Sequence, residues 1–371
     1  MKSVITLLLF FSFTSFLSAQ SVTADYDPVG NDLAPNQYPL QSGLLSMSGN
    51  AYQFGTDKSV TISNPRSFAL SDNGFKVGAL KTGAALTADI YNFTGHLLYS
   101  RELDFANPAD ETVAITVLDS GEFVVRDNVS NFSFFDPAGN RAYTYLNSSQ
   151  SRGGELPSEI ELSSDGVMKV AYNPVIRFNN SRGSRISIVT GDGQADQIFS
   201  SQDETIYRLQ VSDDDHSISV VTEGENSERH IRWFDRFGNL IFEMASDLEV
   251  EGFNFTDDHK YVTLFAGSRI QVYDRSTMER LGSASSRSTV SHAEYFPESN
   301  LIVAIGGEII EGAIRNPEVT AVDLQKRQID RAELSGTVKM MDKDHLSIRK
   351  TGSNSYRVEG LNKPLNVSAR F

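Results

Sequence analysis

The chain has 371 residues, a formal net charge of −15 and no cysteine. The negative charge repels phosphate backbones and anionic lipid, which argues against nucleic acid or an anionic membrane surface as a partner. Without cysteine, disulfides, thiol catalysis and a lipid anchor on cysteine are excluded. A chain of this length can bury a core without disulfides.

The first 19 residues have the pattern of a secretory signal peptide. Lys2 is followed by an apolar run that starts at Val4, and small residues precede position 20. Ser12 and further hydroxyl residues interrupt this run, so it does not predict a membrane-spanning helix. We expect cleavage after Ala19, with Ala24 as the alternative site. The protein is then exported, periplasmic or secreted, and has no transmembrane segment after cleavage.

Residues 20–42 carry three prolines and no hydrophobic period. This composition predicts an extended leader or linker ahead of a single folded domain, 43–371. Candidate strands at 44–47, 51–54 and 59–62 open that domain, and the sequence leaves their place in the fold open.

From residue 67 onward a unit of about 45 residues recurs about seven times. Each unit opens with a polar turn such as Ser71-Asp72-Asn73-Gly74. A second polar turn, for example Asp235-Arg236-Phe237-Gly238, follows roughly 20 residues later, as a unit of four short strands requires. The expected fold is all-β, a β-propeller of about seven four-stranded blades, with roughly six or eight as alternatives.

The expected blades are 67–107, 112–149, 158–202, 205–247, 249–285, 289–333 and 336–371. If the last unit holds a full set of strands, the segment 43–64 is extra. Otherwise that segment supplies the strand that closes the ring, because an open ring leaves exposed strand edges.

An aromatic residue and an aspartate precede Gly-Asn-Leu in the run Trp233-Phe234-Asp235-Arg236-Phe237-Gly238-Asn239-Leu240. With the Ser-Asp-Gly-like turns, this run resembles the broad superfamily of WD-repeat-like, YVTN-type and quinoprotein-type β-propellers. The resemblance implies an architecture and no particular reaction. The chain has one tryptophan, too few for a Trp-Asp pair in each blade, and it lacks the blade motif that holds pyrroloquinoline quinone. No cofactor is expected.

Three of the six histidines, His216, His259 and His345, follow an aspartate in equivalent first turns. Equivalent turns of different blades are spread around a rim, so the pattern favours turn formation over a metal site or an acid–base pair. The segments 192–196 and 213–215 lack the alternating oxygen donors of a calcium loop. No metal site is therefore predicted.

Long insertions between the second and third strands of two units are the candidate binding elements, because loops held by a rigid scaffold often carry binding. One of them concentrates arginine and asparagine in an acidic chain, and these side chains suit carboxylates, sugars or an acidic partner. The candidate ligand-binding residues are Arg152, Arg177, Asn179, Asn180, Arg182, Arg185, Arg315 and Asn316. The alternative is that the insertions are merely tolerated on the surface.

No Gly-x-Ser-x-Gly elbow is present, and a pair of glycosidase carboxylates cannot be recognised from sequence. The sequence thus favours a non-enzymatic, monomeric, exported propeller that binds a protein or glycan partner at the cell envelope. The alternative is a hydrolase or lyase that acts on polysaccharide at the central mouth of the propeller.

Overall fold

A computed structural model describes residues 22–26, 37–39, 44–71, 74–104, 113–127, 131–146, 158–178, 181–212, 216–246, 248–310, 313–340 and 346–371. Within these ranges the regular structure consists of β-strands and one short 3-10 helix, η1 (Pro297–Ser299). The same ranges contain no helix with the length and hydropathy needed to cross a bilayer.

The described strands form eight antiparallel sheets, one of which carries a fifth strand. The first two are β2 (Gln37–Pro39), β3 (Leu44–Ser48), β4 (Ala51–Phe54), β5 (Val60–Ser63), and β6 (Ser67–Leu70), β7 (Lys76–Thr82), β8 (Leu86–Asn92), β9 (Leu97–Leu103). The next two are β10 (Ala114–Val117), β11 (Phe123–Arg126), β12 (Phe132–Phe135), β13 (Arg141–Tyr145), and β14 (Glu159–Leu162), β15 (Lys169–Phe178), β16 (Ser181–Val189), β17 (Ala195–Ser201).

The fifth and sixth sheets are β18 (Glu204–Val211), β19 (Ile218–Gly224), β20 (Arg229–Phe234), β21 (Leu240–Ser246), and β22 (Gly252–Phe255), β23 (Tyr261–Ala266), β24 (Arg269–Asp274), β25 (Arg280–Ser285). The seventh is β26 (Thr289–Phe296), β27 (Leu301–Ile310), β28 (Ala313–Asp323), β29 (Gln328–Glu333), with β30 (Thr337–Lys339) paired to β28. The last is β31 (Ser347–Gly352), β32 (Ser355–Glu359), β33 (Leu365–Ala369) and β1 (Val22–Tyr26).

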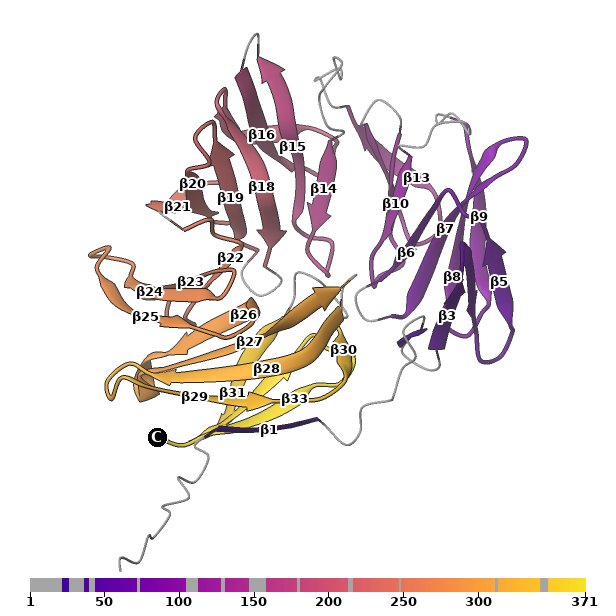
Figure 1. Cartoon of the computed structure of the whole chain (residues 1–371). Helices are drawn as coiled ribbons and strands as arrows, with labels where there is room; N and C mark the ends of the chain where they lie inside the picture. Colours follow the sequence, from indigo (N-terminus) through magenta and orange to yellow (C-terminus); the bar gives the residue numbers. More distant parts are fainter. Residues whose placement is uncertain are drawn as a thin grey trace, which may run out of the picture.

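Consecutive sheets follow one another around a central region, with the first strand of each sheet nearest to it (Figure 1). This is the architecture of a β-propeller. Six sheets, from β6 to β29, coincide with six of the expected units. The expected count of seven is not confirmed, because the strands form eight sheets. The additional sheet is β2–β5, which contains the three candidate strands of the segment 43–64.

The N-terminal strand β1 is the fourth strand of the last sheet. It pairs with β33 over its whole length. The last expected unit, 336–371, holds four strands, but its first strand, β30, pairs with β28 of the preceding sheet, so the last sheet takes its fourth strand from β1. The sequence predicted an extended leader at 20–42, but the structure places β1 and β2 in this segment. The reason is packing: Val22 is fully buried against the sheet β26–β29, and its backbone N–H donates to Asp330 Oδ2 at 2.9 Å.

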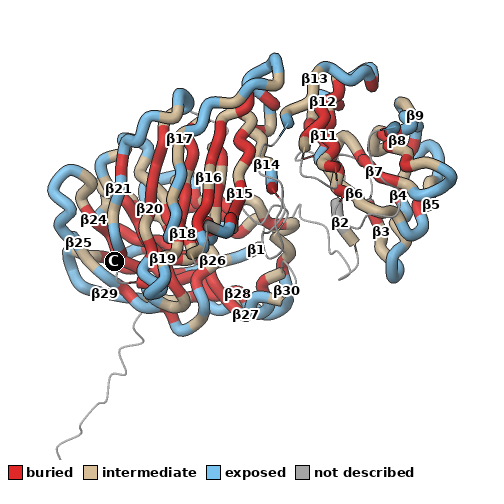
Figure 2. Tube along the Cα trace, turned by 90° about the horizontal axis from the view of Figure 1, so that it is seen from above, coloured by how far each residue is buried: buried red, intermediate tan, exposed pale blue. Residues whose placement is uncertain are grey.

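Seven hydrophobic clusters lie between consecutive sheets and provide the core. The buried positions run along the middle strands of each sheet, and the exposed positions gather on the outermost strands and turns (Figure 2). Burial of apolar side chains between sheets contributes about 25 cal/mol for each Å² removed from water. The Lys339 ammonium of β30, in the seventh sheet, donates to the Gln37 carbonyl of the first sheet at 2.6 Å.

Arginines that are partly or fully buried also hold neighbouring sheets together. Arg126 donates to the carbonyl of Ser158 at 3.0 Å, and Arg229 donates to the carbonyl of Val250 at 2.6 Å. Each acceptor lies just before the first strand of the next sheet: Ser158 precedes β14, and Val250 precedes β22. These bonds satisfy backbone carbonyls that the sheet ladders leave open.

The predicted turn Asp235–Gly238 forms as expected, whereas residues 72–73, 213–215 and 342–345 of three other predicted turns lie outside the described residues. Asp235 Oδ1 accepts the backbone N–H groups of Phe237 and Asn239, both at 2.9 Å, which closes the turn between β20 and β21. Gly238 has φ +82°, and a Cβ at this position would lie 2.1 Å from Ile198 of the preceding sheet. Glycine is therefore required here both by backbone conformation and by the close approach of the preceding sheet.

Candidate functional site

The antiparallel order of the strands gives the sheets two distinct ends. The turns after the first and third strands lie at one end, which we call the turn end. The hairpins between second and third strands lie at the opposite end, which we call the hairpin end. The predicted arginine-rich insertions belong to the hairpin end.

The first predicted insertion is an extension of the sheet. β15 and β16 have ten and nine residues, whereas the corresponding β11 and β12 have four each, and the β15–β16 hairpin projects beyond its neighbours (Figure 1). Arg177 and Arg182 lie directly opposite each other near its tip, and both are exposed. Residues opposite each other in a ladder point to the same face, so two positive charges stand side by side.

Arg185 lies on the other face of the same hairpin. Side chains alternate along β16, and Ser184 bonds to the Glu204 carbonyl of the following sheet at 2.8 Å. Arg185 instead faces the preceding sheet: burial raises the pKa of Tyr145 in β13, and Ser187 and the charge of Arg185 oppose this rise. The three arginines therefore do not line one surface.

The second predicted insertion, between β27 and β28, is likewise a long hairpin. Arg315 is exposed and ion-paired with Glu308 across the ladder at 3.4 Å. Asn316 has φ +47°, and its backbone N–H donates to the Gly336 carbonyl. Two sheets separate this hairpin from β15–β16 in the order of the ring, and the structure does not bring the two groups together. Asn179, Asn180 and Arg152 lie outside the described residues.

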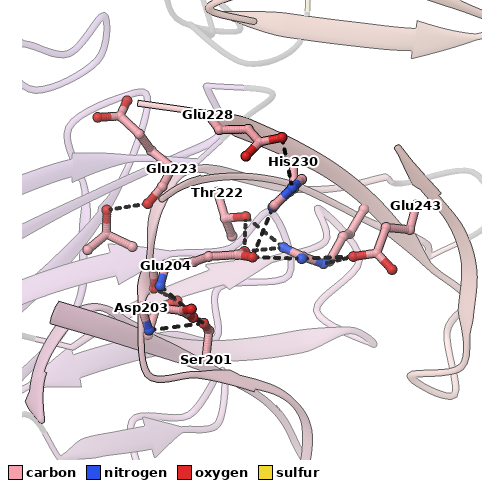
Figure 3. A network of polar contacts seen from close by, with 11 residues as sticks. Ser201, Asp203, Glu204, Thr222, Glu223, Glu228, His230 and Glu243 are labelled. Carbon is pink, nitrogen blue, oxygen red and sulfur yellow. Dashed lines mark hydrogen bonds and ion pairs between the residues drawn. The ribbon is translucent and has the colours of Figure 1, made fainter. Parts of the chain in front are cut away.

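A polar network spans the four strands β18–β21 near the hairpin end (Figure 3). Glu204 accepts hydrogen bonds from both terminal nitrogens of Arg232 and from Thr222, and lies 2.9 Å from His230 Nδ1. Arg232 also pairs with Glu243 at 2.8 Å. Burial acts to raise the pKa of Glu204, but the bonds from Arg232 and Thr222 outweigh it and lower the pKa to about 2. A carboxylate engaged in this way ties strands together and is a poor proton acceptor at neutral pH.

The first-turn histidines were predicted to be turn formers. His216 and His259 both have positive φ, as turn residues do. Neighbouring turns nevertheless touch, contrary to the expected separation: His216 Nε2 lies 2.9 Å from Asp165 Oδ2 of the preceding sheet. His345 lies outside the described residues. Within the described ranges, no three histidine, aspartate or glutamate side chains are grouped as a metal site would need.

A pocket of about 1080 Å³ opens at the turn end. Four consecutive sheets line it. The sheets β18–β21, β22–β25 and β26–β29 contribute mainly the final residues of their first strands and the following turns, and the last sheet contributes Leu346 and the first residues of β31. We call it the axial pocket. Its volume is at the upper end of the range of roughly 300–1,000 Å³ for small-molecule sites. Trp233, the single tryptophan of the chain, is part of its wall.

Three polar side chains from neighbouring first strands meet in the axial pocket. His292 and Glu294 stand two residues apart on β26, and His292 Nε2 lies 2.9 Å from Glu294 Oε1. The same carboxylate oxygen accepts the backbone N–H of Ile348 in the last sheet at 2.8 Å. Asn254 of β22 donates to the Ala293 carbonyl at 2.9 Å. These bonds fix the three side chains in orientation.

Comparisons with known proteins give likenesses of overall shape alone. No family model matches the chain. No curated protein matches it either. Similar solved structures include a eukaryotic initiation factor (9% identity, TM-score 0.44, covering 85% of this chain and 88% of that one) and the C-terminal WD40 domain of Sif2 (12%, 0.43, 89% and 92%). A third is hydrazine synthase of Kuenenia stuttgartiensis (10%, 0.41, 83% and 98%). At these TM-scores we draw no argument from the matches, and the propeller assignment rests on the sheet topology.

The axial pocket was not predicted from the sequence. Asn254, His292 and Glu294 stand in ordinary alternating strand patterns, and Ile348 lies 54 positions further along the chain than Glu294. The one available signal was a histidine and a glutamate two positions apart in a first strand, because such residues point to the same face of the sheet.

Proposed function

We propose that this chain is an exported, monomeric β-propeller that binds an anionic partner, a glycan or protein of the cell envelope, through the β15–β16 hairpin. The observation that supports it is the cross-strand pair Arg177 and Arg182. Like charges directly opposite each other destabilise a ladder by roughly 0.2–1 kcal/mol. A carboxylate bound between them removes that repulsion and accepts charge-assisted hydrogen bonds from both guanidinium groups.

The net negative charge of the whole protein also supports this proposal. With a net charge of −15, the protein as a whole repels anions, so attraction is confined to a local positive site. At physiological ionic strength, screening over about 8 Å limits the repulsion from distant carboxylates. The paired arginines at the projecting tip can then act on a partner without nonspecific binding elsewhere.

Binding assays with two defined polyanions test the proposal. Polygalacturonate represents an acidic glycan and poly-glutamate an acidic protein segment. We expect one of them to bind the wild type, and Arg177→Ala with Arg182→Ala to weaken that binding. Arg315→Ala is the matched control, because it removes an exposed arginine, ion-paired with Glu308, from the other long hairpin. Binding that is unchanged in the double variant, or no binding of either polyanion, would contradict the proposal.

The alternative, a hydrolase or lyase at the central mouth, stays a prediction. Three of the carboxylates that line the axial pocket already have partners: Glu294 is bonded to His292 and Ile348, Asp258 to Lys260, and Glu298 to Lys350. Glycoside hydrolysis ordinarily uses two facing carboxyl groups. Release of shorter products from polygalacturonate during the binding assay would favour the enzyme over the binding protein.

A further inference from the structure

The axial pocket carries hydrogen-bond acceptors that the protein leaves open. Glu294 uses Oε1 for His292 and Ile348, and no hydrogen bond within the described part of the chain reaches its Oε2. Asn254 uses its amide nitrogen for the Ala293 carbonyl and for the His292 ring, whose Nδ1 lies 3.5 Å away, and its Oδ1 makes no bond to a described residue. When His292 Nε2–H donates to Glu294, the Nδ1 of the neutral ring accepts from Asn254, so the histidine holds both side chains in place.

The side chains around the pocket also carry more negative than positive charges. Its wall includes four carboxylates and two cationic side chains: Asp257, Asp258, Glu294, Glu298, Arg349 and Lys350. Glu298 pairs with Lys350 at 2.6 Å and Asp258 with Lys260 at 3.0 Å, so among the described residues Asp257 and Glu294 are the lining carboxylates without a lysine or arginine partner. Such a wall repels anions and favours a ligand that presents several donors at close spacing.

We propose that the axial pocket is a saccharide-binding site, in which Glu294 and Asn254 accept hydrogen bonds from ligand hydroxyl or amino groups and His292 holds both side chains in orientation. A sugar offers a donor on nearly every carbon, which matches two acceptors on neighbouring strands better than a peptide with one N–H per residue. His292 is nine-tenths buried, so its orientation is set before the ligand arrives. The acidic wall excludes uronic acids and admits neutral and amino sugars.

This site lies at the opposite end of the sheets from the β15–β16 hairpin. It therefore does not rest on the proposed function, and the failure of either leaves the other standing. The two sites also differ in the ligands they select. The hairpin selects anionic ligands, and the pocket selects neutral or amino sugars that donate hydrogen bonds.

Tryptophan fluorescence provides the test, because Trp233 is the single tryptophan and lines the pocket. The wild type would be titrated with oligomers of β-linked glucose and of glucosamine. We expect a saturable change in fluorescence with at least one of them, and roughly tenfold weaker binding in Glu294→Gln, because a hydrogen bond to a charged group is lost.

A second pair of variants distinguishes loss of the binding site from misfolding of the Glu294→Gln variant. Ser347→Tyr places a large side chain in the pocket wall, and Ser355→Tyr places the same side chain at an exposed position of the same sheet. We expect Ser347→Tyr to abolish the fluorescence change and Ser355→Tyr to leave it intact. No saturable change with either oligomer, or a change that Ser347→Tyr does not affect, would overturn the inference.

Discussion

Val22 in β1 lies opposite Ala369 in β33, so the first and last strands of the described fold share one ladder. Both residues are buried in the same hydrophobic cluster, together with strands of the neighbouring sheet. Pairing of the chain ends removes the free edge that β33 would otherwise present. The stability of the last sheet therefore depends on a segment more than 300 residues away in sequence.

The first prediction concerns this closure. Val22→Asp buries an unpaired carboxylate, and we expect it to lower the free energy of unfolding by on the order of 3 kcal/mol. Thr23→Asp, at the exposed neighbouring position, is the control and should change stability little. Denaturant unfolding of both variants measures the difference. Equal stabilities would show that β1 does not contribute to the core.

The second prediction concerns the signal peptide that the sequence predicts, because β1 constrains where it could be removed. Cleavage after Ala24 would delete three of the five residues that pair with β33, among them the buried Val22. Cleavage after Ala19 leaves the whole strand in place. We expect mass spectrometry of the exported protein to find Gln20 at its N-terminus. An N-terminus at Asp25 would contradict the role of β1 in the mature protein.

A third prediction concerns the pH dependence of stability. The pKa of Glu204 in the folded protein is about 2, below the ordinary value of 4.5. Its contribution to stability is therefore complete above pH 4.5 and is lost as the pH falls towards 2. We expect Glu204→Gln to lower the melting temperature at pH 7, and the difference from wild type to shrink in this acidic range. A difference that does not vary with pH would argue against the Glu204–Arg232 ion pair.

The fourth prediction tests the arginines between sheets. Arg229 is buried, pairs with Glu223 at 3.1 Å, lies over the Tyr207 ring and donates to the Val250 carbonyl. Lysine keeps the charge but cannot reproduce this geometry, so Arg229→Lys should cost about 1–3 kcal/mol of unfolding free energy. Arg236→Lys, on an exposed turn, is the matched control. A loss of the same size in both variants would exclude a specific role for Arg229.

The parts of the fold that could be predicted from the sequence are those with local chemical causes. The turn Asp235–Gly238 needs a side-chain acceptor followed by a positive φ, and both requirements are visible in four residues. The repeat of such turns placed six sheets correctly. β1 could not be recognised in this way. It has one fully buried residue, Val22, whose burial is not visible in the sequence, and its partner strand lies at the other end of the chain.

The candidate sites likewise combine features that local sequence predicts with features that depend on strand register and on the packing of sheets. The position of Arg177 and Arg182 in a long hairpin followed from spacing and composition, but the face of each arginine depended on the ladder register, and Arg185 fell on the opposite face. The axial pocket depends on how Asn254, His292 and Ile348 of three sheets converge. No local pattern encodes that convergence.

The most direct test of the proposed function is a double-mutant cycle on the hairpin. Affinities for polygalacturonate and poly-glutamate would be measured for the wild type, Arg177→Ala, Arg182→Ala and the double variant. We expect each single change to weaken binding of one polyanion roughly tenfold. The double change should weaken it less than the product of the two, because both arginines hold the same carboxylate. Equal affinities in all four proteins would contradict the account.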